Sequence, residues 1–164
     1  MQHYPLWIKA LLSTLGATAA IATLAALQQW QHILLMAPFG ATAVILFALP
    51  DSPLASAKNV IGGHGLSALV ALLLLHLFGQ STAVVAFAVG LSIGLMVLLH
   101  LTHPPAGATA LLVMLTAPDW WFLFNPVLAG ASVMTLVAWV YHHSHQLSFN
   151  WLRRRRATQT IKAE

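Results

Sequence analysis

The chain has no cysteine and very little charge. The absence of cysteine in its 164 residues excludes a disulfide framework, a thiolate metal site and a cysteine nucleophile. Charged residues make up only 6% of the sequence, whereas a soluble domain carries about 25%. Hydrophobic residues make up 59%, which is too much apolar surface for water. The composition therefore predicts an all-α membrane protein whose outer surface faces the lipid bilayer.

Apolar segments divide the chain into about six pieces. The first segment should stay in the protein as a span, because it lacks the basic start and cleavage site of a signal peptide. Two pieces are broken, one at Pro38 and Gly40 and the other before Pro105. We expect one transmembrane domain over residues 1–146 and a basic tail over 147–164. The expected helical segments are 6–27, 33–49, 59–78, 82–100, 106–117 and 122–141.

Basic residues predict the orientation of the bundle. Lysine and arginine concentrate on the cytoplasmic side of membrane proteins. If all six segments cross, Lys9, Lys58 and the run from Arg153 to Arg156 share one side. We therefore expect both termini in the cytoplasm, with the protein in a bacterial inner membrane. The arginine run follows a hydrophobic span, so it is interpreted as an anchor and not as a nucleic-acid site.

A short motif occurs twice. Residues 38–43 read Pro-Phe-Gly-Ala-Thr-Ala, and residues 105–110 read Pro-Ala-Gly-Ala-Thr-Ala. Each copy is followed by Pro-Asp, then by an asparagine and a glycine, which are Asn59 and Gly63 in the first half and Asn125 and Gly130 in the second. Two halves of three segments each would be inverted relative to one another, as in many transporters. The alternative is chance similarity between Ala- and Gly-rich helices.

The two broken segments predict a binding site at mid-membrane. A proline in the first helical turn loses no hydrogen bond, and Gly40 and Gly107 would allow close backbone approach. Inverted halves would direct two helix N-termini, with free amides, at one point that favours an anion. Thr42 and Thr109 would add hydroxyl groups if they face inward.

Several motifs resemble the HPP family of integral membrane proteins. They are residues 38–43, Ser52-Pro53-Leu54-Ala55, residues 59–64 (Asn-Val-Ile-Gly-Gly-His) and residues 103–108 (His-Pro-Pro-Ala-Gly-Ala). The resemblance covers about 37–130 and implies an anion path, since a plastid member is associated with nitrite transport. The family is usually described with four spans, fewer than the six expected here. Where it commonly has Gln-Pro-Arg, this chain has Ser56-Ala57-Lys58, which removes the bidentate arginine fork.

Polar side chains near the breaks are the candidate ligands of the anion. His103 would bind substrate, relay a proton, or cap the preceding helix. By the resemblance His64 belongs to the same site, although it could simply bond another helix. Asn59 and Asn125 would cap their helices or donate to an anion. The predicted substrate-binding set is Pro38, Gly40, Ala41, Thr42, Asn59, Gly63, His64, His103, Pro105, Gly107, Ala108, Thr109 and Asn125.

Other functions have weaker support in the sequence. No nucleophile with a base and no acid–base pair is evident, so we do not expect an enzyme. His100 and His103 lack the carboxylate or cysteine that would complete a metal shell, so neither metal nor cofactor is expected. The predicted function is a transporter or channel for a small inorganic anion, with nitrite the leading candidate. The alternative is a structural or assembly protein without transport. Small-residue faces favour a homo-oligomer, most simply a dimer.

Overall fold

The computed structural model describes residues 4–31 and 35–144, so the predicted tail over 147–164 lies outside the described residues. Every regular element in the described part is helical. In chain order the elements are α1 (Leu6–Gln31), α2 (Ala37–Ala48), the short 3-10 helix η1 (Pro53–Ala55), α3 (Ala57–Phe78), α4 (Thr82–Leu98) and α5 (Pro104–Thr116). A C-terminal helix, Leu123–Ser144, begins with the π-helical segment η2 (Leu123–Leu128). The predicted all-α architecture is confirmed.

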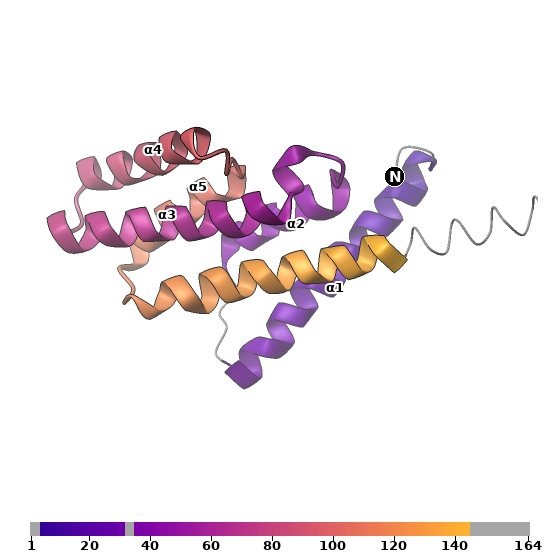
Figure 1. Cartoon of the computed structure of the whole chain (residues 1–164). Helices are drawn as coiled ribbons and strands as arrows, with labels where there is room; N and C mark the ends of the chain where they lie inside the picture. Colours follow the sequence, from indigo (N-terminus) through magenta and orange to yellow (C-terminus); the bar gives the residue numbers. More distant parts are fainter. Residues whose placement is uncertain (1–3, 32–34, 145–164) are drawn as a thin grey trace, which may run out of the picture.

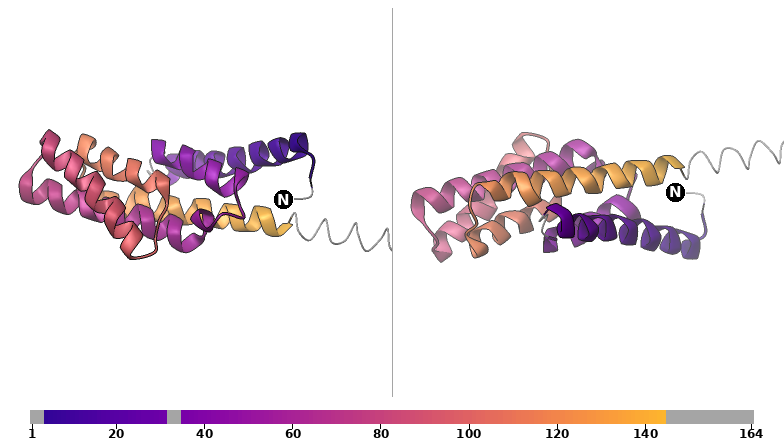
Figure 2. Two further views of the ribbon diagram at one scale, coloured as in Figure 1. Left: turned by 90° about the horizontal axis from the view of Figure 1, so that it is seen from above. Right: turned by 90° about the horizontal axis from the view of Figure 1, so that it is seen from below.

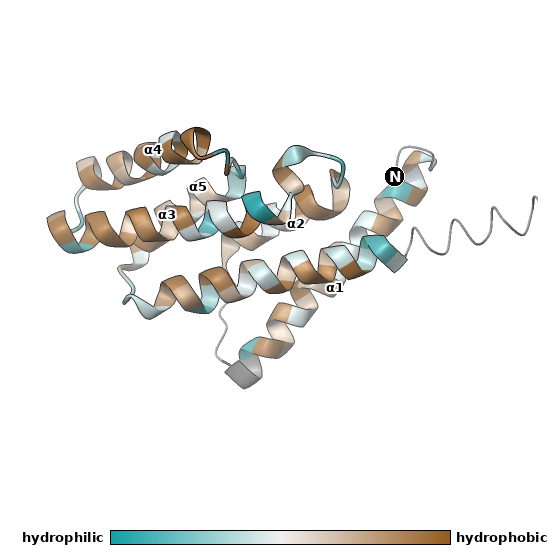
Figure 3. Ribbon diagram, viewed as in Figure 1, coloured by the Kyte–Doolittle hydropathy of each residue, from teal (hydrophilic) through white to brown (hydrophobic). Residues whose placement is uncertain are grey.

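Three helices are long and apolar enough to cross a membrane: Leu6–Gln28, Ala57–Phe78 and Leu123–Ser144. The predicted membrane class therefore stands. The other three helices, α2, α4 and α5, have 12, 17 and 13 residues, which at 1.5 Å per residue is about 18 to 26 Å. Figure 3 shows hydrophobic residues along most of each helix and hydrophilic ones mainly near the helix ends.

Local sequence signals explain where the helices begin and end. Ser56 and Ser81 cap α3 and α4, because their hydroxyl groups accept from the amides of Asn59 and Val84. In contrast, α2 and α5 begin with proline in the first turn and without a side-chain cap. At Gly79, where α3 ends, φ is +71°, a conformation that suits glycine.

The central helix of the bundle is α3, which packs against α4, α5 and η2 (Figure 1). The short helix α2 packs against both α1 and α5. In Figures 1 and 2, α2 and α5 start near one another and extend toward opposite ends of the molecule. The start of α1 and the end of the C-terminal helix lie at one end, and the α3–α4 turn lies at the other.

Candidate functional site

Four polar side chains are fully buried together between α2, α3 and α5. Thr42 and Thr109 lie in the first halves of α2 and α5, His64 lies in α3, and His103 directly precedes α5. Each is 0% exposed, although buried polar groups are costly in an apolar bundle. We call these four residues the Thr–His cluster.

The members of the cluster are joined by hydrogen bonds. The hydroxyl oxygen of Thr42 lies 2.8 Å from Nε2 of His64 and 3.0 Å from Nε2 of His103. Nδ1 of His64 lies 2.7 Å from the hydroxyl oxygen of Thr109. Two carbonyl groups complete the set. Nδ1 of His103 donates to the Leu54 carbonyl at 2.9 Å, and the Thr42 hydroxyl oxygen lies 3.2 Å from the Pro38 carbonyl oxygen. Because the bonds link three helices and η1, they fix the rings in place.

Aromatic contacts hold the same two rings. The ring centroids of His64 and His103 are 5.0 Å apart at an angle of 65°. The Phe39 ring meets His64 edge-on, at 5.4 Å and 77°. Such edge-to-face arrangements are favourable for aromatic rings. The cluster therefore has a hydrophobic wall on its α2 side.

Two glycines let neighbouring helices approach the site. A Cβ atom at Gly63 would lie 2.9 Å from the Cβ of His103, 3.0 Å from the Leu101 carbonyl oxygen and 3.4 Å from the Cβ of Ala106. A Cβ atom at Gly130 would lie 2.7 Å from Cζ of Phe39. Both positions therefore need glycine for close packing.

A family model matches most of the chain. The model of the HPP transmembrane region matches residues 2–149. The chain belongs to the HPP transmembrane family. A Dictyostelium discoideum protein named only as a transmembrane protein is 41% identical over 121 residues, which is 69% of this chain and 42% of that protein. A second one is 35% identical over 121 residues, which is 69% of this chain and 39% of its own length. The HPP chain thus spans about two-fifths of these relatives, and no solved structure matches it.

Several residues predicted for the site do meet in this HPP protein. Thr42, His64, His103 and Thr109 form the cluster, and Pro38, Gly63 and Pro105 are buried. The alternative role of His103, as a cap of the preceding helix, is wrong, because its ring reaches η1 instead. Sequence reasoning missed the Leu54 carbonyl and the Phe39 ring, since neither a backbone group nor a hydrophobic side chain gives a motif.

The predicted close approach at Gly40 and Gly107 is wrong. Gly40 is exposed, and a Cβ atom there would meet nothing within 4 Å. A Cβ atom at Gly107 would have Ile93 as its nearest neighbour, at 4.0 Å. The following residues, Ala41 and Ala108, are also exposed. The reason is helix geometry, because about 100° per residue places a glycine two positions before an inward threonine on another face.

Asn59 does not cap α3, which corrects a further prediction. Ser56 is the cap of α3, and the Asn59 side chain donates to the carbonyls of Pro53 and Thr102, at 3.2 and 3.1 Å. It therefore ties η1 to the segment that leads into His103. Asn125 lies inside the C-terminal span, where its φ and ψ of −134° and 111° interrupt the helix.

Free helix amides are also fewer than predicted. The first two residues of α5 are Pro104 and Pro105, which have no N–H, and the Ala106 amide donates to the His103 carbonyl at 2.9 Å. In α2 the Phe39 amide likewise donates to Met36, at 2.9 Å. The polar groups that the Thr–His cluster offers to a ligand are therefore hydroxyl and imidazole groups.

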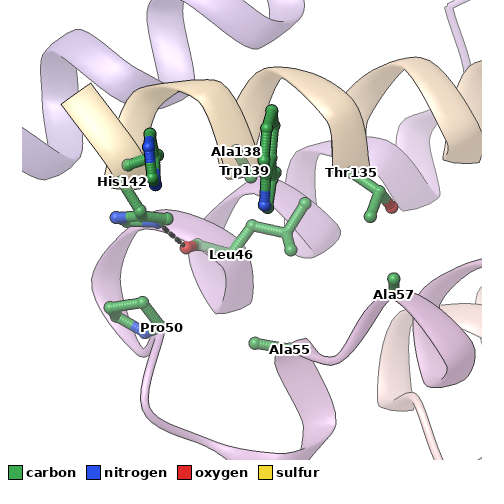
Figure 4. A pocket seen from close by; sticks show the side chains of 9 residues that line it. Leu46, Pro50, Ala55, Ala57, Thr135, Ala138, Trp139 and His142 are labelled. Atoms are coloured by element: carbon green, nitrogen blue, oxygen red, sulfur yellow. Dashed lines mark hydrogen bonds between the residues drawn. The ribbon is translucent and has the colours of Figure 1, made fainter.

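A pocket of about 270 Å³ lies beyond the cluster, between α2, η1 and the C-terminal helix (Figure 4). The His142 Nε2 donates to the Leu46 carbonyl at 2.9 Å across it. Leu46 lies one helical turn after Thr42, and Ala55 directly follows Leu54. The pocket therefore borders both elements that hold His103. It is lined by Leu46, Pro50, Ala55, Ala57, Thr135, Ala138, Trp139, His142 and His143.

Proposed function

We propose that this HPP protein moves a small inorganic anion across the membrane, with nitrite as the first candidate. The observation that carries the proposal is the Thr–His cluster, four fully buried polar side chains at the junction of two short helices. Polar residues inside a membrane bundle are costly, and they commonly mark substrate paths. Broken helices that meet at mid-membrane are typical of transporter binding sites. The protein would then be a carrier or channel and not an enzyme.

Contacts between the two halves support an inverted repeat. Gly63 of the first half packs near Ala106, which follows Pro105. Gly130 of the second half packs on Phe39, which follows Pro38. Equivalent glycines would thus meet equivalent positions of the opposite half. The opposed directions of α2 and α5 in Figure 1 agree with such a relation.

The placement of the helix ends supports an even number of crossings, which the proposed topology of six crossings requires. The start of α1, which carries Lys9, lies at the same end of the molecule as the end of the C-terminal helix (Figure 1). Positive residues favour the cytoplasmic side. We therefore propose that both termini are cytoplasmic and that the membrane is the bacterial inner membrane.

The pocket in Figure 4 supplies a path from that side. It borders Leu46 and Ala55. Leu46 lies one helical turn after Thr42, and Ala55 directly follows Leu54, whose carbonyl accepts from His103. The small side chains of residues such as Ala57 and Ala138 leave space for this pocket. We assign it the role of a cytoplasmic vestibule that leads to the Thr–His cluster.

Transport by purified protein in liposomes tests the proposal. Entry of nitrite, nitrate, chloride and formate is measured for the parent and for Thr42→Val and Thr109→Val. Each valine keeps the shape but removes a hydroxyl group, so we expect flux to fall about tenfold, the effect of about 1.4 kcal/mol from one lost hydrogen bond.

Two matched variants complete the test. Thr42→Ser keeps the hydroxyl group and should retain flux. Gly90→Ala lies on an exposed face of α4, where a Cβ atom would meet nothing within 4 Å, and it should behave as the parent. Correctly inserted protein that admits none of the four anions would refute the transport proposal and favour an assembly role.

A further inference from the structure

The contacts of the Thr–His cluster require more hydrogens than its neutral form holds. Five contacts at hydrogen-bond distance join the cluster internally and to the carbonyls of Pro38 and Leu54. Each needs one hydrogen. A neutral imidazole and a threonine hydroxyl each supply one, so two of each supply four. The neutral cluster is one hydrogen short.

The two carbonyl groups determine which contacts of the neutral cluster compete for a hydrogen. A carbonyl oxygen only accepts, so Nδ1 of His103 must carry a hydrogen for Leu54. In neutral His103 the other nitrogen, Nε2, is then an acceptor. The Thr42 hydroxyl has one hydrogen, which can go either to that nitrogen at 3.0 Å or to Pro38 at 3.2 Å, but not fully to both.

One added proton fills every contact. With a hydrogen on each nitrogen, His103 donates to both Leu54 and Thr42. The Thr42 oxygen then accepts from His103 and His64 through its two lone pairs and donates to Pro38. Thr109 continues to donate to His64. The geometry therefore contains a place for one proton.

A proton in this place needs a negative partner. The groups in contact with the two rings are the threonine hydroxyls, the Leu54 carbonyl, the Phe39 ring and the other imidazole. The titratable group that faces each ring is thus the other histidine, and none of these contacts supplies a negative charge. A buried charge without a partner is strongly unfavourable. The partner must come with the ligand.

We propose that the Thr–His cluster takes up one proton together with one monovalent anion, so that transport carries no net charge. This inference rests on the proposed function. When the anion binds, His64 can take the tautomer that carries its hydrogen on Nδ1, so that it donates to Thr109 and accepts from Thr42. The Thr109 hydroxyl hydrogen is then free to bind the anion, in exchange for the contact between Thr42 and Pro38. The proton and the anion enter as a pair and leave as a pair, with no covalent bond formed or broken.

Vesicles loaded with the pH dye pyranine test the coupling. An inward gradient of nitrite or nitrate is applied at equal pH on both sides, and anion entry and lumen pH are followed together. We expect the lumen to acidify with one proton for each anion. Rates from protein-free vesicles are subtracted, because nitrous acid crosses lipid unaided.

A second measurement clamps the membrane potential with potassium and valinomycin. Coupled, electroneutral entry should have the same rate at an inside-positive potential and at zero. Anion entry that accelerates at an inside-positive potential, without lumen acidification, overturns the coupling and leaves the proposed transport intact. Absence of entry for both anions overturns the proposed function and the coupling with it.

The variant His103→Gln isolates the proton. Its amide can donate to Leu54 and accept from Thr42, as neutral His103 does, but it cannot take up a proton. We expect acidification to fall at least about tenfold, the cost of losing a hydrogen bond to a charged group. His76→Gln is the matched control, because His76 is exposed and bonds the Leu72 carbonyl of its own helix. An unchanged ratio of protons to anions in His103→Gln contradicts the proposal.

Discussion

At the scale of single residues, small side chains determine how closely the helices meet. Gly62 and Gly63 are adjacent in α3, and a Cβ atom at either position would meet the segment from Leu101 to His103. A Cβ atom at Gly62 would meet the end of the Leu101 side chain at 2.8 Å. At Gly63 it would meet the Cβ of His103 at 2.9 Å and the Leu101 backbone oxygen at 3.0 Å. A side-chain end can turn away, whereas backbone and Cβ atoms cannot move alone.

Gly63→Ala should therefore be more harmful than Gly62→Ala. Overpacking of a well-packed site costs about 1–3 kcal/mol, and we expect this loss at Gly63 but only a small one at Gly62. Thermal unfolding in mild detergent measures the difference, and anion flux measures the displacement of His103. Equal losses in the two variants would show that the α3–α5 contact is looser than the structure indicates.

At the scale of elements, the short helix η1 links the cluster to the pocket. The Leu54 carbonyl accepts from His103 on one side, while Ala55 lines the pocket on the other. The Asn59 side chain holds η1 through Pro53. An obstruction in the pocket should therefore stop transport without touching the cluster itself.

Thr135→Cys tests this expectation, and the lack of native cysteine makes the introduced thiol unique. Thr135 lines the pocket and is half-buried. Attachment of a bulky methanethiosulfonate reagent should reduce flux at least about tenfold, because the added group would fill the proposed path of the ion. Ala83→Cys, exposed in the first turn of α4, is the control and should keep its flux after labelling. Full flux through labelled Thr135→Cys would exclude the pocket as the path.

At the scale of the whole molecule, the arrangement of the helix ends bears on orientation and assembly. The chain ends described by the structure lie together, opposite the α3–α4 turn (Figure 2). A groove of about 660 Å³ is lined by α1 and α2 and includes small residues such as Ala17, Ala22 and Gly40. Small residues commonly permit helix contacts between membrane subunits. The homo-oligomer remains a prediction that the protein's mass in detergent and lipid can test.

Thiol labelling of intact cells tests the orientation. Ala57→Cys, at the start of α3, should be protected from an impermeant reagent, because Lys58 beside it favours the cytoplasm. Ala83→Cys, beyond the α3–α4 turn, should react. After permeabilisation both should react. Labelling of Ala57→Cys in intact cells would invert the proposed topology.

Hydropathy and proline are local properties, so the order of the amino acids was enough to predict the membrane class and the two breaks. The low charge, the long apolar runs and the repeated proline motif led to helices that the structure contains, α2 and α5 among them. The motifs also selected Thr42, His64, His103 and Thr109 as candidates. Asn59 was misplaced because a cap depends on where a helix starts, and Ser56 starts α3 three residues earlier.

Which groups face one another depends on the packing of the helices. The rotation of a helix about its axis is fixed by its neighbours, because each residue turns the face by about 100°. That rotation directs Thr42 at the histidines and Gly40 away from them. The Leu54 carbonyl is 49 positions from His103 in the chain and carries no sequence signal. The hydrogen count of the cluster depends on that carbonyl, so the proton site belongs to the fold and not to any one motif.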